Sequence, residues 1–241
     1  MTQSPAQPHA RTALVVGGSR GIGAGIVRRF AEDGASVVFT YANSPDPAHR
    51  LAAETGARGV HADSGNRKAL VQAIASLGAL DVAVINAGLG LIGDPLTLDA
   101  DAVDRLIDVN IRGAYFAAVE AGRRMNEDGR IIILGSGLGN AARAPGATPY
   151  GMTKAAMQGL TRGLARDFGG RRITVNCIQP GPVDTDMNPK DGPFAAPLHA
   201  GMCIPRHATT DEIADLAAYL AGPSAAMITG AMLTIDGGYT C

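Results

Sequence analysis

Short apolar runs rich in valine and isoleucine alternate with helix-period segments along almost the whole chain. The apolar runs are Thr12–Val16, Ser36–Tyr41, Gly59–His61, Asp81–Ile85, Arg130–Leu134, Thr174–Ile178 and Met232–Ile235. Consecutive apolar positions are typical of strands that are buried on both faces, as they are in parallel sheets. The pattern therefore predicts seven strands in one parallel sheet.

The segments between these runs have the apolar spacing of helices. They are Ile22–Asp33, Pro47–Thr55, Arg67–Leu77, Ala100–Met125, Pro149–Phe168 and Asp211–Ala221. Because parallel strands need crossover connections, this alternation predicts an α/β fold whose helices cover both faces of a doubly wound sheet. Neither an internal repeat nor a Pro/Ser-rich linker divides the chain, so we expect one domain over residues 11–241 and a flexible polar tail at residues 1–10.

One segment, residues 184–206, interrupts the alternation with several prolines and two glycines. Loops of this length are uncommon in compact domains and often act as lids over a site. The segment also follows the end of a strand, where open α/β sheets hold their ligands. We therefore expect a substrate lid here, with Met187 of the lid and Leu138 of a preceding loop among the apolar side chains of the substrate site.

Composition excludes several classes of protein. The chain has 241 residues, 46% of them hydrophobic, and a net charge of −1, which gives no indication of binding to nucleic acid or to an anionic membrane. No apolar run is long enough to span a bilayer, and the first residues lack the apolar segment of a signal peptide. The three cysteines and five histidines form neither a disulfide framework nor a metal-ligand pattern. We expect a cytoplasmic protein with reduced thiols and no metal.

Glycines at positions 17, 21 and 23 lie between the first strand and the first helix. They permit a tight turn and let the backbone approach a pyrophosphate, while the helix N-terminus adds free N–H groups and a partial positive charge. Glycine turns are common, but in this place within a βαβ unit they predict a dinucleotide site. The residues expected to contact the cofactor are Gly17, Ser19, Arg20, Gly21, Ile22 and Gly23.

The end of the second strand bears on which dinucleotide is bound. An acidic residue there would accept hydrogen bonds from the ribose of NAD and repel a 2′-phosphate. The chain has Tyr41, Asn43 and Ser44 at this point instead, and Arg20 in the glycine loop. These residues favour NADP(H) over NAD(H). They could also be ordinary solvated turn residues, and the nearby Asp46 keeps that alternative open.

Two more strand ends carry candidate cofactor residues. After the third strand, the Asp63 carboxylate could accept a hydrogen bond from the adenine amino group, with Ser64 beside it; alternatively, one of the two caps the following helix. After the fourth strand, Asn86, Ala87 and Gly88 are small enough for the nicotinamide ribose to lie against the strand end. Asn86 could also tie neighbouring strands together.

The end of the sixth strand has the sequence of a turn that faces a cofactor. Pro180, Gly181, Val183 and Thr185 follow this strand at the carboxyl edge of the sheet. We expect this backbone to bond the nicotinamide carboxamide, with Thr185 reaching the carboxamide or a phosphate. A purely structural turn is the competing interpretation.

Tyr150 and Lys154 lie one helical turn apart near the start of a predicted helix, on the same face. A phenol has a pKa of about 10, and a neighbouring ammonium favours its ionised form. Tyr150 is therefore a candidate general acid and base. Ser136, at the end of the fifth strand, supplies a hydroxyl that could hold a substrate oxygen beside it. An isolated pair of this kind is usually a solvated one, but here it follows a glycine loop and Ser136 in order.

Asn110 lies inside the predicted helix Ala100–Met125, where asparagine has a low propensity. Its side chain could open the helix locally and hold a water molecule next to Lys154, which would create a proton relay. The alternative is a polar residue whose hydrogen bonds are satisfied by helix packing. The sequence does not decide between the two.

Together these residues resemble the classical branch of the short-chain dehydrogenase/reductase family, from Thr12 to Gly238. The matching residues are Gly17, Ser19, Arg20, Ile22 and Gly23, then Asn86, Ala87 and Gly88, then Pro180 and Gly181, and the catalytic tetrad Asn110, Ser136, Tyr150 and Lys154. The resemblance implies a Rossmann fold, a carbonyl reductase or alcohol dehydrogenase that uses NADPH on a small carbonyl or alcohol substrate, and a homotetramer.

Two positions depart from the family pattern. Val16 stands where a threonine is usual, and the interval between Ser136 and Tyr150 is one residue longer than the commonest spacing. The chain is similar both to members labelled 3-oxoacyl-carrier-protein reductases and to members that bind cyclic di-GMP. A cyclic-di-GMP-binding regulator on the same fold is therefore the alternative function. The presence of Tyr150 with Lys154 favours an enzyme, because a binding protein has no need of this pair.

Overall fold

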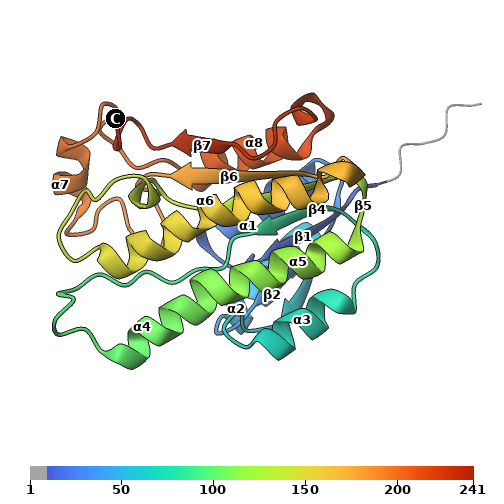
Figure 1. Cartoon of the computed structure of the whole chain (residues 1–241), viewed down its shortest axis with the longest axis horizontal. Helices are drawn as coiled ribbons and strands as arrows, with labels where there is room; N and C mark the ends of the chain where they lie inside the picture. The colour runs from blue at the N-terminus through green and yellow to red at the C-terminus, as the bar shows by residue number, and fades with distance from the viewer. Residues whose placement is uncertain (1–9) are drawn as a thin grey trace, which may run out of the picture.

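The computed structural model describes residues 10–241, so the tail expected at residues 1–10 lies, apart from Ala10, outside the described residues. Seven strands form one sheet in the order β3-β2-β1-β4-β5-β6-β7, and every neighbouring pair is parallel (Figure 1). The strands are β1 (Thr12–Val16), β2 (Ser36–Tyr41), β3 (Arg58–His61), β4 (Leu80–Ile85), β5 (Met125–Leu134), β6 (Thr174–Pro180) and β7 (Met232–Ile235). The predicted doubly wound parallel sheet is confirmed.

Helices connect the strands on both faces of the sheet. They are α1 (Gly21–Glu32), α2 (Pro45–Thr55), α3 (Arg67–Ala75), α4 (Ala100–Ile107), α5 (Ala114–Arg124), α6 (Thr148–Phe168), α7 (Ala195–Ala200) and α8 (Thr210–Ala221). Each predicted helix is present, with ends that shift by at most two residues, except for Ala100–Met125.

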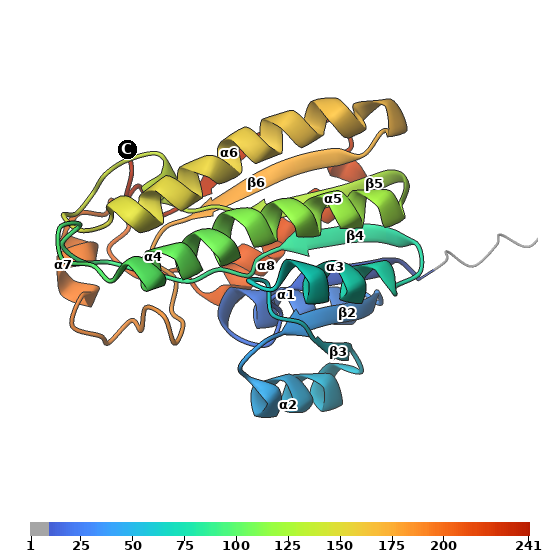
Figure 2. The ribbon, with the colours of Figure 1, turned by 60° about the horizontal axis from the view of Figure 1, so that its bottom comes forward.

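Alternating side chains of each strand enter two separate apolar layers. Ala13 and Val15 of β1 belong to the layer that includes α1, α2 and α8, whereas Leu14 and Val16 belong to the layer that includes α3, α5 and α6 (Figures 1 and 2). Because both strand faces are covered, consecutive positions of most strands are apolar, which is why the strands read as hydrophobic segments.

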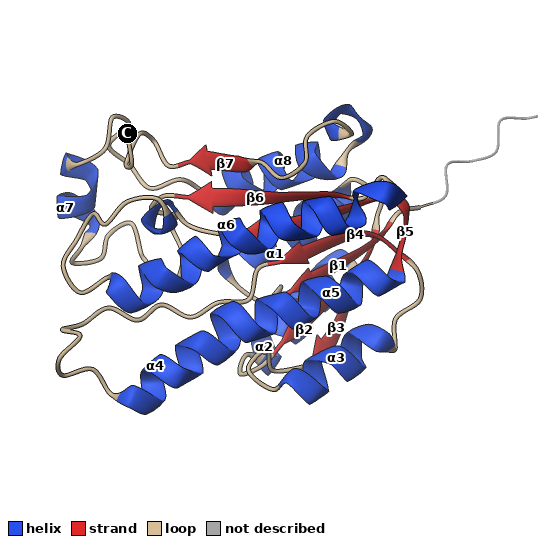
Figure 3. Cartoon of the chain, in the orientation of Figure 1, coloured by secondary structure: helices blue, strands red, loops and turns tan. Residues whose placement is uncertain are grey.

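Since all strands are parallel, their carboxyl ends share one edge of the sheet. Figure 3 shows the arrowheads of β6 and β7 pointing to the side where α7 lies and where α4 and α6 begin. The loops that follow the strands therefore gather at this edge, together with the first turns of these helices, as ligand sites of open α/β sheets require.

The helix predicted over Ala100–Met125 is not continuous. It consists of α4, a π-helical segment over Asp108–Gly113, and α5, and Met125 already pairs with Leu80 as the first residue of β5. A π-helical turn admits one more residue than an α-helical turn, and such turns are frequent at functional sites. Hydrophobic periodicity cannot detect so local a change.

The segment 184–206 was expected to be a loop throughout, and this was wrong over Ala195–Ala200, which forms the short helix α7. Pro197 does not prevent this helix. It is the third helical residue, and the first four N–H groups of any helix have no intrahelical acceptor, so the N–H that proline lacks is not missed.

A capping box should stabilise α8, which packs against α1. The Thr209 hydroxyl accepts from the Glu212 N–H at 3.2 Å, and the Glu212 carboxylate accepts from the Thr209 N–H at 2.8 Å. We expect Thr209→Ala to lower the free energy of unfolding by about 1 kcal/mol. Urea unfolding followed by circular dichroism measures this, and an unchanged midpoint would contradict it.

Glu212 should also make the stability of the fold depend on pH. Hydrogen bonds from Arg206 and from the Thr209 N–H lower the pKa of Glu212 from 4.5 to about 2. Its contribution to stability is therefore present above pH 4.5 and is lost as the pH falls towards 2. Glu212→Gln should flatten the stability profile in this range only.

Candidate active site

The glycine loop after β1 has a backbone that only glycine fits at two positions. Gly17 has φ of 79°, and a Cβ there would lie 2.6 Å from Ala87 Cα. A Cβ on Gly23 would lie 2.2 Å from the carbonyl oxygen of Gly17. Two side chains hold this turn: Asn86 Nδ2 donates to Gly17 O at 2.7 Å, and Gly17 N–H donates to Thr40 Oγ1 at 3.0 Å.

The first turn of α1 is suited to an anion. Arg20 occupies its N-cap position without a side-chain capping hydrogen bond, and the first turn contains no acidic residue. The N–H groups at such a terminus and its partial positive charge favour phosphate. The predicted residue Ile22 lies in this turn and packs against the core, and Ser19 directly precedes the N-cap residue. The uncapped helix and the close glycine backbone fit the pyrophosphate of a dinucleotide.

Gly88 follows the end of β4, which adjoins the glycine loop. It lies against the predicted catalytic residues Lys154 and Asn110. Asn86 and Ala87 both donate backbone hydrogen bonds to Val16 O, at 3.1 and 2.8 Å, which holds the ends of β4 and β1 together. Two residues on, a Cβ on Gly88 would lie 3.4 Å from Lys154 Nζ and 3.5 Å from Asn110 Oδ1. The interpretation of Asn86 as a tie between strands therefore describes its contacts in this structure.

Tyr150 and Lys154 lie on one face of the first two turns of α6. Lys154 Nζ lies 5.7 Å from the centroid of the Tyr150 ring and donates a hydrogen bond to Leu134 O at 3.0 Å. The lysine is 6% exposed, and this acceptor is a neutral carbonyl rather than a carboxylate. A positive charge is thus held in a largely buried place, one helical turn from the phenol.

Asn110 lies in the π-helical segment and uses its amide group on protein partners. Its Oδ1 accepts from Leu89 N–H at 2.8 Å, and its Nδ2 donates to Leu89 O at 2.9 Å and to Thr153 Oγ1 at 3.0 Å. The helix is widened into a π-helical turn at this residue, which agrees with the alternative that the helix opens locally at Asn110. Both amide hydrogens are nevertheless committed, so a relay water would have to be held by other atoms, and the relay stays a prediction.

Thr153 was not among the residues predicted for the site, although it is fully buried within it. Its hydroxyl accepts from Asn110 and donates to Tyr150 O at 2.8 Å, which joins the π-helical segment to the helix of Tyr150. The available signal was its place three residues after Tyr150, on the same helical face.

Removing the Thr153 hydroxyl tests this link. We expect Thr153→Val to lower the free energy of unfolding by about 1–3 kcal/mol, because a buried Asn110 donor loses its acceptor while the side-chain volume hardly changes. Thr148→Val on the exposed start of the same helix is the control. Equal unfolding midpoints of Thr153→Val and the control in urea would rule out a structural role of the hydroxyl.

Ser136 follows β5 and begins a short helical turn over Gly137–Gly139. Its Oγ accepts from Leu138 N–H at 3.2 Å, which leaves the hydroxyl hydrogen to donate elsewhere. The turn is pressed against α6, since a Cβ on Gly139 would lie 2.8 Å from the carbonyl carbon of Lys154. Ser136 and the Tyr150–Lys154 pair are therefore on adjoining segments despite the longer interval in sequence.

The end of β3 differs from expectation. Asn66, not Asp63 or Ser64, caps α3, by accepting from Ala69 N–H at 3.1 Å, so the capping alternative was wrong. Asp63 accepts instead from Arg105 at 2.7 and 2.8 Å and from Gly65 N–H at 2.9 Å. Partial burial acts to raise the pKa of Asp63, but these hydrogen bonds more than offset it and the pKa is lowered. Its contact with adenine stays a prediction.

The residues predicted to select the dinucleotide lie near the end of β2. The Tyr41 ring packs edge-on against His61 with centroids 5.6 Å apart, Asn43 is exposed, and Ser44 is the N-cap residue of α2. Asp46 belongs to the first turn of α2, where an acidic side chain is favourable to the helix.

The segment after β6 contacts both β7 and the glycine loop. Gly181 N–H donates to Ile235 O at 3.0 Å, which fixes the turn that Pro180 begins, and Val183 is buried. A Cβ on Gly21 would lie 3.2 Å from Thr185 Cγ2, so Thr185 lies against the glycine loop.

The segment 184–206 contacts both the glycine loop and the loop that follows β4. Asp186 forms an exposed ion pair with Arg20 at 3.5 Å, a contact that the sequence did not indicate. Met187 is 62% exposed, and its Sδ lies 3.3 Å from the position that a Cβ would take on Gly90. The segment 184–206 therefore contacts the loop that follows β4, and its role as a substrate lid stays a prediction.

Residues 10–241 contain neither a membrane-spanning helix nor a cluster of metal-ligating side chains. None of the helices there combines the length and apolarity needed to cross a membrane. No three histidine, cysteine or acidic side chains in the described part of the chain are grouped as metal ligands.

Known proteins resemble this chain over nearly its whole length. A family model described as enoyl-(acyl carrier protein) reductase matches residues 16–240. The cyclic-di-GMP-binding biofilm dispersal mediator protein of Escherichia coli K12 is 54% identical over 229 residues, which cover 95% of this chain and 97% of that protein. The crystal structure of BdcA in complex with NADPH has a TM-score of 0.93 at 54% identity and covers 95% of this chain and 93% of its own. A short chain dehydrogenase from Burkholderia cenocepacia J2315 in complex with NADP has a TM-score of 0.92 at 41% identity, over 96% of this chain and 98% of its own.

Proposed function

Because the chain belongs to the short-chain dehydrogenase/reductase family, we propose that it is an NADPH-dependent oxidoreductase that interconverts a ketone and a secondary alcohol. The strongest support is one contact: Lys154 Nζ lies 5.7 Å from the centroid of the Tyr150 ring and close to Gly88. Gly88 follows Ala87, which lies against Gly17 of the glycine loop, so the phenol and the ammonium are near that loop at the carboxyl edge of the sheet.

NADP(H) is the cofactor that we propose, rather than NAD(H). No acidic residue directly follows β2, and two relatives were crystallised with NADPH and with NADP. The residues proposed to hold it are Gly17, Ser19, Arg20, Gly21, Ile22, Gly23, Tyr41, Asn43, Ser44, Asp63, Ser64, Asn86, Ala87, Gly88, Pro180, Gly181, Val183 and Thr185. When bound, the nicotinamide supplies or accepts the hydride.

The chain's own residues would hold the substrate and move the proton. The Ser136 hydroxyl donates a hydrogen bond to the carbonyl oxygen, and Tyr150 gives its phenolic proton to the same oxygen during reduction or accepts it during oxidation. Lys154 keeps a positive charge beside the phenol that loses the proton. Asn110 holds the loop at Leu89 and, through Thr153, the start of α6 in their places. Leu138 and Met187 would line an apolar wall, which suits a modest hydrophobic ketone.

The test is NADPH consumption with a panel of ketones of increasing apolar size, repeated with NADH. We expect turnover of at least one ketone and a higher kcat/KM for NADPH than for NADH. Failure of the purified protein to bind NADPH in calorimetry would overturn the assignment, and equal use of both dinucleotides would overturn the cofactor preference.

A second function is favoured by one specific relative. The E. coli protein at 54% identity is named for binding cyclic di-GMP, and we propose that this chain also binds that nucleotide. Calorimetric titration of cyclic di-GMP, with and without saturating NADPH, tests this directly. A measurable affinity supports the binding activity, and competition with NADPH would mean that the two share a site. An absence of heat both with and without NADPH would refute it.

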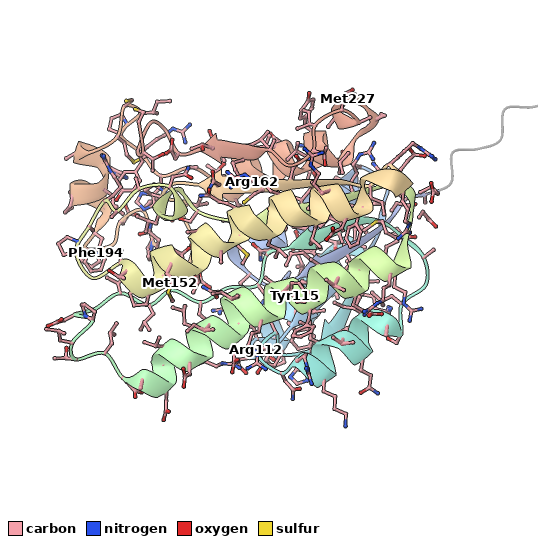
Figure 4. All side chains as sticks on the ribbon, in the orientation of Figure 1. Arg112, Tyr115, Met152, Arg162, Phe194 and Met227 are labelled. Carbon is pink, nitrogen blue, oxygen red and sulfur yellow. The ribbon has the colours of Figure 1, made fainter. Side chains whose placement is uncertain are left out.

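We propose a homotetramer whose copies meet through the outer face of α5 and α6. A groove of about 350 Å³ lies between these helices. Gly159 and Gly163 are exposed there, and a Cβ on either would meet no atom within 4 Å. Figure 4 labels Tyr115 on α5 and Arg162 on α6, the two helices that flank this groove. Small residues of this kind let a second copy approach closely.

Light scattering after size exclusion should give a tetramer for the natural chain and a smaller species for Gly163→Lys, whose long charged side chain blocks that approach. A monomeric natural chain would end the proposal. We also propose the cytoplasm as its location, since three widely spaced cysteines give no framework of structural disulfides, as is typical of a reducing compartment.

A further inference from the structure

We propose that Cys203 and Cys241 form a reversible disulfide that ties the lid segment to the C-terminal segment. The two sulfurs lie 3.6 Å apart, although the residues are 38 positions apart in sequence. Both side chains are exposed. This inference goes beyond the proposed function and does not depend on it.

The backbone around the two thiols already holds the two segments together. Ile204 N–H donates to Gly237 O at 2.8 Å, directly beside the thiol pair. Gly238 has φ of 76°, and a Cβ there would lie 2.6 Å from the sulfur of Cys203 and 3.4 Å from that of Cys241. The space in which the sulfurs meet therefore exists because residue 238 has no side chain. Figure 1 shows the C-terminus beside the segment that contains α7.

Bond formation needs a further approach of the two sulfurs. A disulfide has a sulfur–sulfur distance of about 2.05 Å, and the exposed thiols already lie 3.6 Å apart. The hydrogen bond between the two thiols raises the pKa of Cys203. Since the thiolate is the reactive form, oxidation should accelerate as the pH rises.

The third cysteine is a natural control. Cys177 lies fully buried in β6, and burial raises the pKa of its thiol to about 11. A buried, protonated thiol is inert towards disulfide exchange. Oxidation should therefore change two of the three cysteines and leave Cys177 reduced.

The oxidant that we specify is a small-molecule disulfide. One protein thiolate attacks it and releases one small thiol, which leaves a mixed disulfide; the second protein thiolate then attacks the protein sulfur of that bond and releases the other small thiol. The two protein thiols lose two electrons and two protons in total, and the small-molecule disulfide gains them. The product closes the chain from the lid to the C-terminal segment.

The bond should restrict the lid, because Cys203 lies within residues 184–206. Its partner segment is itself anchored: Asp236 accepts from Gly238 N–H at 2.9 Å and from Thr240 N–H at 2.9 Å. The oxidised lid would thus be held at its C-terminal end by a covalent bond to an ordered turn. Proteolytic cleavage within the lid, which requires local opening, should slow several-fold.

The experiment uses the full chain equilibrated with glutathione and glutathione disulfide at a series of ratios. Free thiols are alkylated under native conditions and, separately, after denaturation, and intact mass and peptide maps are recorded. We expect two native labels on the reduced protein, none on the oxidised protein, and one label on Cys177 after denaturation of the oxidised protein. Peptide mapping should find Cys203 joined to Cys241 within one chain.

The variants Cys203→Ser and Cys241→Ser separate this bond from general reactivity. Each should instead carry one glutathione on its remaining exposed cysteine and should lose the protection of the lid from proteolysis. Glutathione on both exposed cysteines of the natural chain would overturn the proposal. So would a disulfide between two copies, or native labels that persist at every ratio.

Discussion

Replacing Tyr150 with phenylalanine is expected to lower kcat for ketone reduction about 10²–10⁴-fold, which is the usual contribution of a positioned general acid. The change removes one oxygen atom and leaves the ring that lies beside Lys154 Nζ at 5.7 Å. Folding and NADPH binding should therefore persist, because neither the glycine loop nor the hydrogen bond from Lys154 to Leu134 O involves the phenol.

Steady-state kinetics with the best ketone of the panel, together with NADPH calorimetry, measure this. Tyr219→Phe is the matched control, because Tyr219 is half exposed on α8 and lies outside the proposed site. A Tyr150→Phe protein with kcat within twofold of the natural chain would refute the role of the phenol. Loss of NADPH binding in that variant would mean that the residue acts on the cofactor instead.

Gly23→Ala is expected to weaken NADPH binding by roughly 10- to 100-fold and to destabilise the fold. Alanine in a helix normally improves on glycine by about 1 kcal/mol. At this position, however, the new methyl group would lie 2.2 Å from Gly17 O and 2.6 Å from Asn86 Nδ2. Relieving the overlap moves the backbone that is proposed to cradle the pyrophosphate, and overpacking of this kind costs about 1–3 kcal/mol.

Gly78→Ala separates this effect from a general effect of replacing glycine. A Cβ on Gly78 meets no atom within 4 Å, so its unfolding midpoint and its NADPH affinity should match those of the natural chain. Calorimetry gives the affinity and urea unfolding gives the stability. If Gly23→Ala bound NADPH as tightly as Gly78→Ala, the glycine loop would not be the pyrophosphate site.

The predictions of strands and of their arrangement were confirmed where a long hydrophobic pattern supported them. The seven strands and their parallel arrangement follow from apolar runs that are buried on both faces. The π-helical segment over Asp108–Gly113 and the short helix α7 were missed, because each alters only about one turn of backbone. Patterns that need several turns to appear cannot register such changes.

Within the site, the motif residues could be predicted and their long-range partners could not. Arg105 lies 42 positions from Asp63, and Thr153 lies 43 positions from Asn110. Both contacts arise because separate crossover connections begin at the same edge of the sheet. Nothing local to Asp63 indicates whether its carboxylate faces solvent, a helix end or an arginine from another helix.

The sequence by itself determined the type of sheet, the glycine turn after the first strand, and the placement of Tyr150 one turn from Lys154, since each depends on spacing within a single element. Only the tertiary structure decided that Gly88 lies between Lys154 and Asn110, that Asp186 pairs with Arg20, and that Cys203 meets Cys241. The physical reason is that hydrophobic patterning specifies which face of an element is buried, whereas contacts between loops depend on where the packed elements bring their ends together.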